Sequence, residues 1–179
     1  MQARQLRFQM QCLAIVLGML AAWPTVVAAG AEGFIVLPDN APRFPGPVGR
    51  ESNVFEILAT REQTGGTFGL FRLTVAPQGG PGVHIHRGED EFFYVLKGEF
   101  RFKVGDRVVS GPVGTFIFLP RGHGHTFQNI GTEPGILLGG VLPGGVEGLF
   151  TEMSGADAEK LKKLTEKYMI EFIGPPLGR

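Results

Sequence analysis

The sequence has little of what would point to several large classes of protein. It contains one cysteine, Cys12, so a framework of disulfides is excluded. It has no excess of charge of either sign, because 17 lysine and arginine residues balance 17 aspartate and glutamate residues. Without a basic surface or an acidic tail, nothing indicates a nucleic-acid partner. Repeats of solenoid length are also absent from the 179 residues, which are enough for one domain with a core.

The first thirty-one residues differ in composition from the rest of the chain. Arg4 and Arg7 precede an apolar run that begins at Cys12, and the small residues Ala29-Gly30-Ala31 follow. This order predicts a signal peptide over residues 1–31, with cleavage after Ala31 and export to the periplasm or the medium. Cleavage would remove Cys12, so that no thiol chemistry operates in the mature chain.

The alternative for this segment is an uncleaved anchor. Residues 13–31 are about long enough to cross a bilayer, and a membrane is a partner of the protein only in that case.

The remainder of the chain has the pattern of an all-β fold. Its many glycines and prolines separate short apolar runs, as in a sandwich or barrel whose closure removes exposed edges. We expect an extended arm over 32–52, a β-barrel over 53–148 and a C-terminal helix and tail over 149–179. The expected strands are 54–60, 67–76, 83–86, 92–96, 99–104, 107–109, 116–119, 125–128 and 136–142. Alternating aromatic residues on these strands are expected mostly to fill the core, namely Phe92, Tyr94, Phe100, Phe102, Phe116, Phe118 and Phe127.

The C-terminal region has helical periodicity. Ser154 and Asp157 form a plausible capping pair, apolar residues such as Leu161 and Leu164 follow at helical spacing, and Gly174-Pro175-Pro176 ends the segment. We expect this helix to pack on the outside of the barrel; the alternative is a lid or a partner-binding helix.

All four histidines lie in two short clusters, His84-Ile85-His86 and His123-Gly124-His125. On a strand, residues i and i+2 point to the same face, so His84 and His86 can present two imidazoles to one point. Glu91 opens the next strand and can return a carboxylate to that point. Imidazole and carboxylate are ligands that suit divalent first-row metals. A third imidazole from His125 would complete three nitrogens and one oxygen.

Three other residues compete for places in such a site. Glu89 and Asp90 are close to Glu91, but their strand phase is poorer and a charged run in a turn is usually solvated. His123 could be a ligand, a proton carrier or a group that supports a ligand, and we favour the last of these roles.

These residues also carry a family resemblance. His84, His86, Glu91 and Gly98 match the first motif of the cupins, and the second motif is matched by Gly114, Pro120, Gly122, His125 and Asn129. One departure is Gly79, which lies one residue closer to His84 than is usual. The resemblance covers about residues 53–148 and implies a jelly-roll β-barrel, followed here by a short C-terminal α-helix. It also implies that His84, His86, Glu91 and His125 hold a metal ion, which in such proteins is Mn, Fe, Ni, Cu or Zn.

A second similarity, less specific than the two motifs, concerns function. The single domain and the ending KYMIEFIGPPL resemble small bacterial cupins related to quercetin dioxygenases. This similarity implies a metal-dependent dioxygenase acting on a small aromatic or flavonol-like substrate, with Glu91 as a catalytic residue that takes a proton from the substrate. Cupins also often form homodimers through edge strands.

Two alternatives remain open at this point. One is another exported cupin enzyme, directed at oxalate or isomerising a sugar. Oxalate would need a cationic or amide group inside the barrel; Arg72 and Arg101 are available on strands, and we expect both to face solvent. The other is a non-catalytic module that binds a metal or a small ligand.

Overall fold

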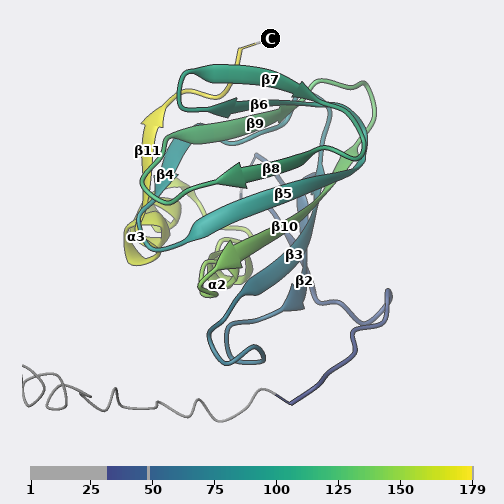
Figure 1. Ribbon diagram of the computed structural model, residues 1–179. Helices are drawn as coiled ribbons and strands as arrows, with labels where there is room; N and C mark the ends of the chain where they lie inside the picture. Colours follow the sequence, from purple (N-terminus) through teal and green to yellow (C-terminus); the bar gives the residue numbers. More distant parts are fainter. Residues whose placement is uncertain (1–31, 48, 179) are drawn as a thin grey trace, which may run out of the picture. The chain divides into compact units, whose positions relative to one another are not determined.

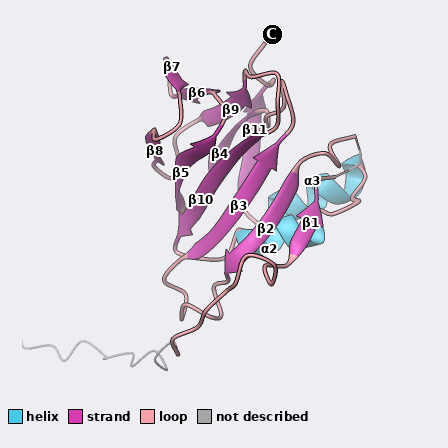
Figure 2. Cartoon of the chain, turned by 90° about the vertical axis from the view of Figure 1, so that its right-hand side faces the viewer, coloured by secondary structure: helices cyan, strands magenta, loops and turns pink. Residues whose placement is uncertain are grey.

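The part of the chain that the structure describes forms two antiparallel β-sheets that face each other, with two short helices at one side (Figures 1 and 2). The computed structural model describes residues 32–47 and 49–178, so the predicted signal peptide with Cys12 lies outside the described residues. The six-stranded sheet has the order β1 (Arg43–Pro45), β2 (Val54–Ala59), β3 (Gly69–Val75), β10 (Gly135–Leu142), β5 (Asp90–Lys97) and β8 (Phe116–Leu119). The five-stranded sheet has the order β11 (Ile170–Gly174), β4 (Val83–His86), β9 (His125–Asn129), β6 (Phe100–Val104) and β7 (Arg107–Gly111). The helices are α2 (Glu147–Glu152) and α3 (Ala158–Lys167).

This arrangement confirms the expected all-β jelly-roll fold with a short C-terminal helix. Each of the nine expected strands is present, with ends that agree to within about two residues. The sequence analysis did not anticipate β1, which falls in the segment expected to be an extended arm, nor α2 and β11. None of the helices in the described part of the chain is long and apolar enough to span a membrane.

The core lies between the sheets and is rich in phenylalanine. Along β3, Phe71, Leu73 and Val75 are buried in alternation with less buried neighbours, as the two-residue repeat of a strand requires. Phe93 of β5 and Phe127 of β9 meet edge to face across the interior, with ring centroids 5.2 Å apart. Gly139 of β10 leaves space for the rings of Phe71 and Phe93. A Cβ atom at this position would lie 2.8 Å from Phe93 and still closer to Phe71.

The expectation that these strand aromatics mostly fill the core is wrong, because four of the seven do not. Phe100, Phe102 and Phe127 are buried, whereas Tyr94, Phe116 and Phe118 are exposed and Phe92 is half-buried. The reason is strand phase. Glu91, Phe93 and Val95 point inward, so Phe92 and Tyr94 point outward, and their register partners on β8, Phe118 and Phe116, share that outer face.

The C-terminal region joins the two sheets. Asp157 is the N-cap of α3, and its side chain accepts a hydrogen bond from the backbone N–H of Lys160 at 2.8 Å, so the cap is Asp157 and not the expected pair with Ser154. Helix α2 packs against β3 of the first sheet, and α3 packs against α2 and against β11 of the second sheet. The two helices therefore cover the side where the sheets would otherwise be open (Figure 1).

Candidate metal centre

Three strands bring the four predicted ligands together. His84 and His86 lie on β4 in the same phase, His125 lies on β9 directly opposite His84, and Glu91 reaches across from β5 of the other sheet. All four side chains are buried. Each offers one ligand atom, and these four atoms lie within 4.8 Å of one another, so the cluster could hold a metal ion.

The side chains are crowded around one point. The His84 ring lies 4.5 Å from the His125 ring and 5.1 Å from the His86 ring, measured between centroids. Oε2 of Glu91 lies 3.2 Å from Nε2 of His125 and 4.0 Å from Nε2 of His86. The carboxylate therefore faces the Nε2 side of at least two rings.

The Nδ1 atom of each ring has an acceptor of its own. Nδ1 of His84 lies 2.9 Å from the Gly82 carbonyl, and Nδ1 of His125 lies 2.9 Å from the His123 carbonyl. Nδ1 of His86 lies 2.7 Å from Oε1 of Glu89. A carbonyl or carboxylate oxygen can only accept, so Nδ1 donates in each case and Nε2 keeps its lone pair for a metal.

One buried atom in the cluster has no hydrogen-bond partner. Among the described residues, Nε2 of His125 makes none. With its proton on Nδ1, the ring has no N–H to donate to Oε2 of Glu91, 3.2 Å away. A buried polar atom without a partner costs free energy unless a bound group satisfies it. Three imidazole nitrogens and one carboxylate oxygen are a suitable donor set for a divalent first-row metal, so the residues present fit the group that the sequence predicts.

The charges of the cluster depend on its burial. Burial, with the neighbouring His125 and His86 rings, lowers the pKa of His84 to about 3, so this ring is neutral near pH 7. Burial alone would lower the pKa of His86, but the Glu91 and Glu89 carboxylates outweigh it and raise that pKa. Burial would raise the pKa of Glu91, but the His86 and His125 rings outweigh it and lower that pKa, so Glu91 is ionised near neutral pH.

The structure separates the competing residues. Asp90 points away to Arg121, with an Oδ2 to Nη2 distance of 3.0 Å, and the His123 ring is exposed. His123 contacts the cluster through its main-chain carbonyl, not through its ring. Glu89, expected to be solvated in a turn, is buried against His86. Its separation of three residues from His86 was the only signal in the sequence.

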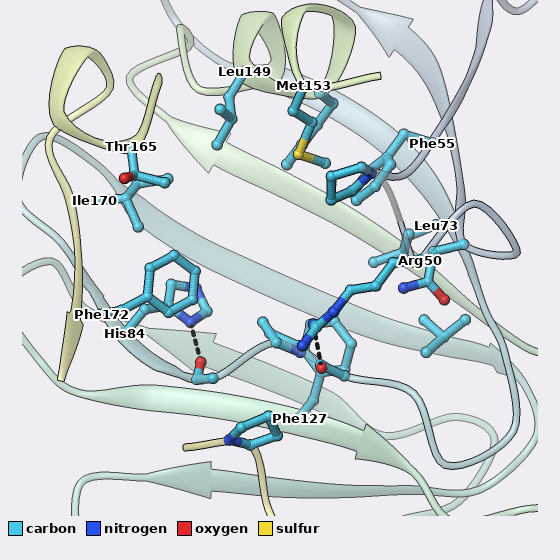
Figure 3. Close-up of a pocket in the computed structure, with 18 of the residues that line it drawn as sticks. Arg50, Phe55, Leu73, His84, Phe127, Leu149, Met153, Thr165, Ile170 and Phe172 are labelled. Carbon is cyan, nitrogen blue, oxygen red and sulfur yellow. Dashed lines mark hydrogen bonds between the residues drawn. The ribbon is translucent and has the colours of Figure 1, made fainter. Parts of the chain in front are cut away.

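A cavity of about 460 Å³ opens beside the cluster and is lined by His84, His86 and Glu91 among others. The rest of its wall is mainly apolar and comes from both sheets and from the C-terminal region. Figure 3 shows Leu149 of α2 and Met153, which directly follows α2, on one side of the pocket and Phe127 on the other. Phe172 of β11 lies beside His84, with ring centroids 5.5 Å apart. Leu161 and Thr165 also line the cavity, so α3 both packs on the barrel and forms part of the wall.

These features define a class of protein: a jelly-roll barrel with a buried histidine and glutamate cluster beside an apolar cavity. Residues 71–139 match the family model described as Cupin domain. Over these residues the chain is similar to the cupins.

Solved structures show the same fold. A KdgF from a Halomonas species has 12% identity and a TM-score of 0.57, over 65% of this chain and 98% of that one. A predicted oxalate decarboxylase from Thermotoga maritima has 23% identity and a TM-score of 0.55, over 62% and 99%. A polyketide cyclase from Streptomyces resistomycificus has 23% identity and a TM-score of 0.53, over 62% and 80%. No curated protein matches the sequence.

Proposed function

We propose that this cupin binds a divalent transition metal through His84, His86, Glu91 and His125 and acts as a dioxygenase on a small aromatic or flavonol-like substrate. The observation that carries the proposal is the opening of this cluster onto a cavity whose wall is otherwise mainly apolar. Its volume of about 460 Å³ is within the range of small-molecule sites. The ligand types alone do not select one metal, because selection among divalent metals depends on coordination geometry and on which metal is available.

The protein's own groups have distinct parts in this proposal. A metal held by the four residues supplies Lewis-acid chemistry beside the cavity. The phenylalanine-rich wall orients a planar substrate and excludes water. Glu91 is ionised near neutral pH and is buried, so its carboxylate can accept a proton from a substrate hydroxyl group.

Oxygen uptake tests the dioxygenase. The mature protein is loaded in turn with Mn, Fe, Ni, Cu or Zn and supplied with a panel of flavonols and catechols. We expect uptake with at least one metal, and its loss in Glu91→Gln; Glu133→Gln, an exposed acid elsewhere, is the matched control. If none of the five metals supports oxygen uptake, the dioxygenase is contradicted and a module that only binds a metal or a small ligand is favoured. Unchanged turnover of Glu91→Gln at full metal occupancy contradicts the role of Glu91 as a base.

The two other cupin activities are less well supported. Oxalate is a small dianion that would need a cationic or amide group close to the metal. Arg72 is bound by Glu56, and neither Arg72 nor Arg101 lines the cavity. Arg50 does line it but is exposed to solvent and not buried with the cluster. A sugar would need many hydrogen-bonding groups, and the wall offers few.

We further propose that residues 1–31 direct export and are then removed. The basic start, the apolar run and the small residues before Glu32 support this. Sequencing of the exported protein is expected to begin at Glu32, and an intact Met1 or Gln2 contradicts cleavage.

A further inference from the structure

Arg50 is the only arginine or lysine among the described residues that line the cavity. It lies in the loop between β1 and β2 and is exposed to solvent, which places it where the cavity opens. Its Nη1 donates a hydrogen bond to the Gly80 carbonyl at 2.8 Å (Figure 3). This bond anchors the guanidinium against the cavity wall.

Most of the hydrogen-bonding capacity of Arg50 is unused. A guanidinium has five N–H donors in a planar fork, and the bond to Gly80 uses one of them. In the part of the chain that the structure describes, no carboxylate forms an ion pair with Arg50. The remaining donors face water at the mouth of the cavity.

Asn53, a neutral polar residue, lines the cavity beside Arg50, and its backbone N–H donates to the Arg50 carbonyl. The rest of the wall is mainly apolar and includes Pro47, Phe55, Leu73 and Pro81. A ligand that fills the cavity removes water from the guanidinium. If the ligand is neutral and apolar throughout, it leaves donors of a charged group without partners, which costs free energy. If the ligand carries an anionic group at that end, a charge-assisted and bidentate contact replaces the lost water.

We infer that Arg50 determines specificity for an anionic group on an otherwise apolar substrate, so that the cavity takes aromatic acids in preference to their neutral counterparts. This inference rests on the proposed function, because it names the substrate class of the same site. In this arrangement the acid group lies at the mouth with Arg50 and the apolar body lies against the phenylalanine wall.

A matched pair of fluorescent probes tests the inference. Anilinonaphthalene sulfonate and N-phenylnaphthylamine share an aromatic body and differ by one sulfonate. Their dissociation constants are measured for the wild type, Arg50→Gln and Arg50→Lys, in metal-free protein so that a bound metal does not attract the anion. We expect Arg50→Gln to weaken binding of the sulfonate probe by roughly tenfold and to leave the affinity for the neutral probe unchanged. The affinity of Arg50→Lys for the sulfonate probe is expected to lie in between.

The matched control is Arg107→Gln, which removes the same charge from an exposed position on β7 that does not line the cavity. Phe118→Ser controls for binding of a probe to the exposed outer face of β8. Both are expected to leave the two dissociation constants unchanged. The unchanged affinity for the neutral probe also reports that Arg50→Gln is folded.

Three results overturn the inference. They are equal affinity of the wild type for both probes, no binding of either probe, and an equal loss of affinity for both probes in Arg50→Gln. Failure of the metal site is a separate result, because it appears as absent metal in the wild-type protein while the probe preference is measured without metal.

Discussion

The carboxylate of Glu89 lies 2.7 Å from Nδ1 of His86, and both side chains are buried. The carboxylate accepts a hydrogen bond from Nδ1–H, which fixes the tautomer of His86 and turns its Nε2 lone pair toward Glu91 and His125. His84 and His125 are oriented by backbone carbonyls instead. A charged acceptor raises the basicity of an imidazole more than a neutral one does, so His86 is expected to be the strongest nitrogen donor of the three.

The first prediction concerns this support of His86. Glu89→Ala is expected to weaken metal affinity by roughly 10- to 100-fold, because His86 loses its orienting acceptor. Glu89→Gln keeps an oxygen acceptor and is expected to lose less. Competition with a chromophoric chelator measures both, with Glu133→Ala, an exposed acid, as the control. Equal affinities of Glu89→Ala and the wild type would show that Glu89 does not act through His86.

The second prediction separates the two histidines of the second cluster. His125→Ala is expected to abolish stoichiometric metal retention, because its Nε2 faces the cluster and has no other partner among the described residues. His123→Ala is expected to retain the metal, since its ring is exposed and the carbonyl that holds His125 remains. Metal content after gel filtration measures this. The reverse result, with loss only in His123→Ala, would contradict the assignment of His125.

The grouping of the four predicted ligands could be predicted from the sequence because it depends on local rules and on the family motifs. His84 and His86 share a face through strand periodicity, and the spacing of Glu91 and His125 follows family motifs that the fold bears out. Glu89 could not be placed in this way. Whether an acid in a turn is solvated or buried depends on what packs over it. The neighbouring Gly88 lies so near Met169 that a Cβ atom there would come within 2.8 Å of its side chain. Met169 is 81 positions further along the chain and directly precedes β11.

The residues that line the cavity could not be predicted from the sequence for the same reason. Strand β11 pairs with β4, opposite His84 and His86, through a contact between residues some eighty positions apart. The run at its end, Gly174-Pro175-Pro176, indicated the end of a helix, whereas the helix already ends at Lys167. Short apolar stretches such as 170–173 fit a strand or a helix equally well, and only tertiary pairing decides between them.

The third prediction concerns how the stability of the fold depends on pH through a buried ion pair outside the predicted metal centre. Glu56 of β2 is buried and binds Arg72 and Arg43. The hydrogen bond from Arg72 outweighs burial and lowers the pKa of Glu56 below its usual 4.5. A lowered folded-state pKa gives stability that is present above pH 4.5 and is lost as the pH falls through the folded-state value.

Glu56→Gln is therefore expected to lower the free energy of unfolding by about 1–3 kcal/mol at neutral pH. The difference from the wild type is expected to shrink as the pH falls below 4.5, because the wild-type carboxyl then also becomes neutral. Denaturant unfolding of both proteins at a series of pH values measures it. A difference that stays constant with pH would show that the ion pair does not provide the stability.

The fourth prediction tests the packing of the core. Gly139→Ala adds a Cβ atom that would lie 2.8 Å from Phe93 and closer still to Phe71, both of which are buried. Overpacking of this kind is expected to cost about 1–3 kcal/mol in the free energy of unfolding. Gly33→Ala is the control, because a Cβ atom there meets nothing within 4 Å. Equal stability of the two variants would mean that the rings adjust without cost.

The fifth prediction assigns part of the cavity to β11. Phe172 lines the cavity beside His84, whereas the adjacent Ile173 does not line it. Phe172→Ala removes an aromatic surface but no metal ligand, so metal content is expected to stay at the wild-type level. Affinity for the neutral probe N-phenylnaphthylamine is expected to fall about two- to tenfold, as for the loss of one aromatic contact. Ile173→Ala, a change of the next residue along the same strand, is expected to alter neither. If Phe172→Ala lost metal as well, β11 would support the metal ligands and not only the wall, since it pairs with the strand that carries His84 and His86.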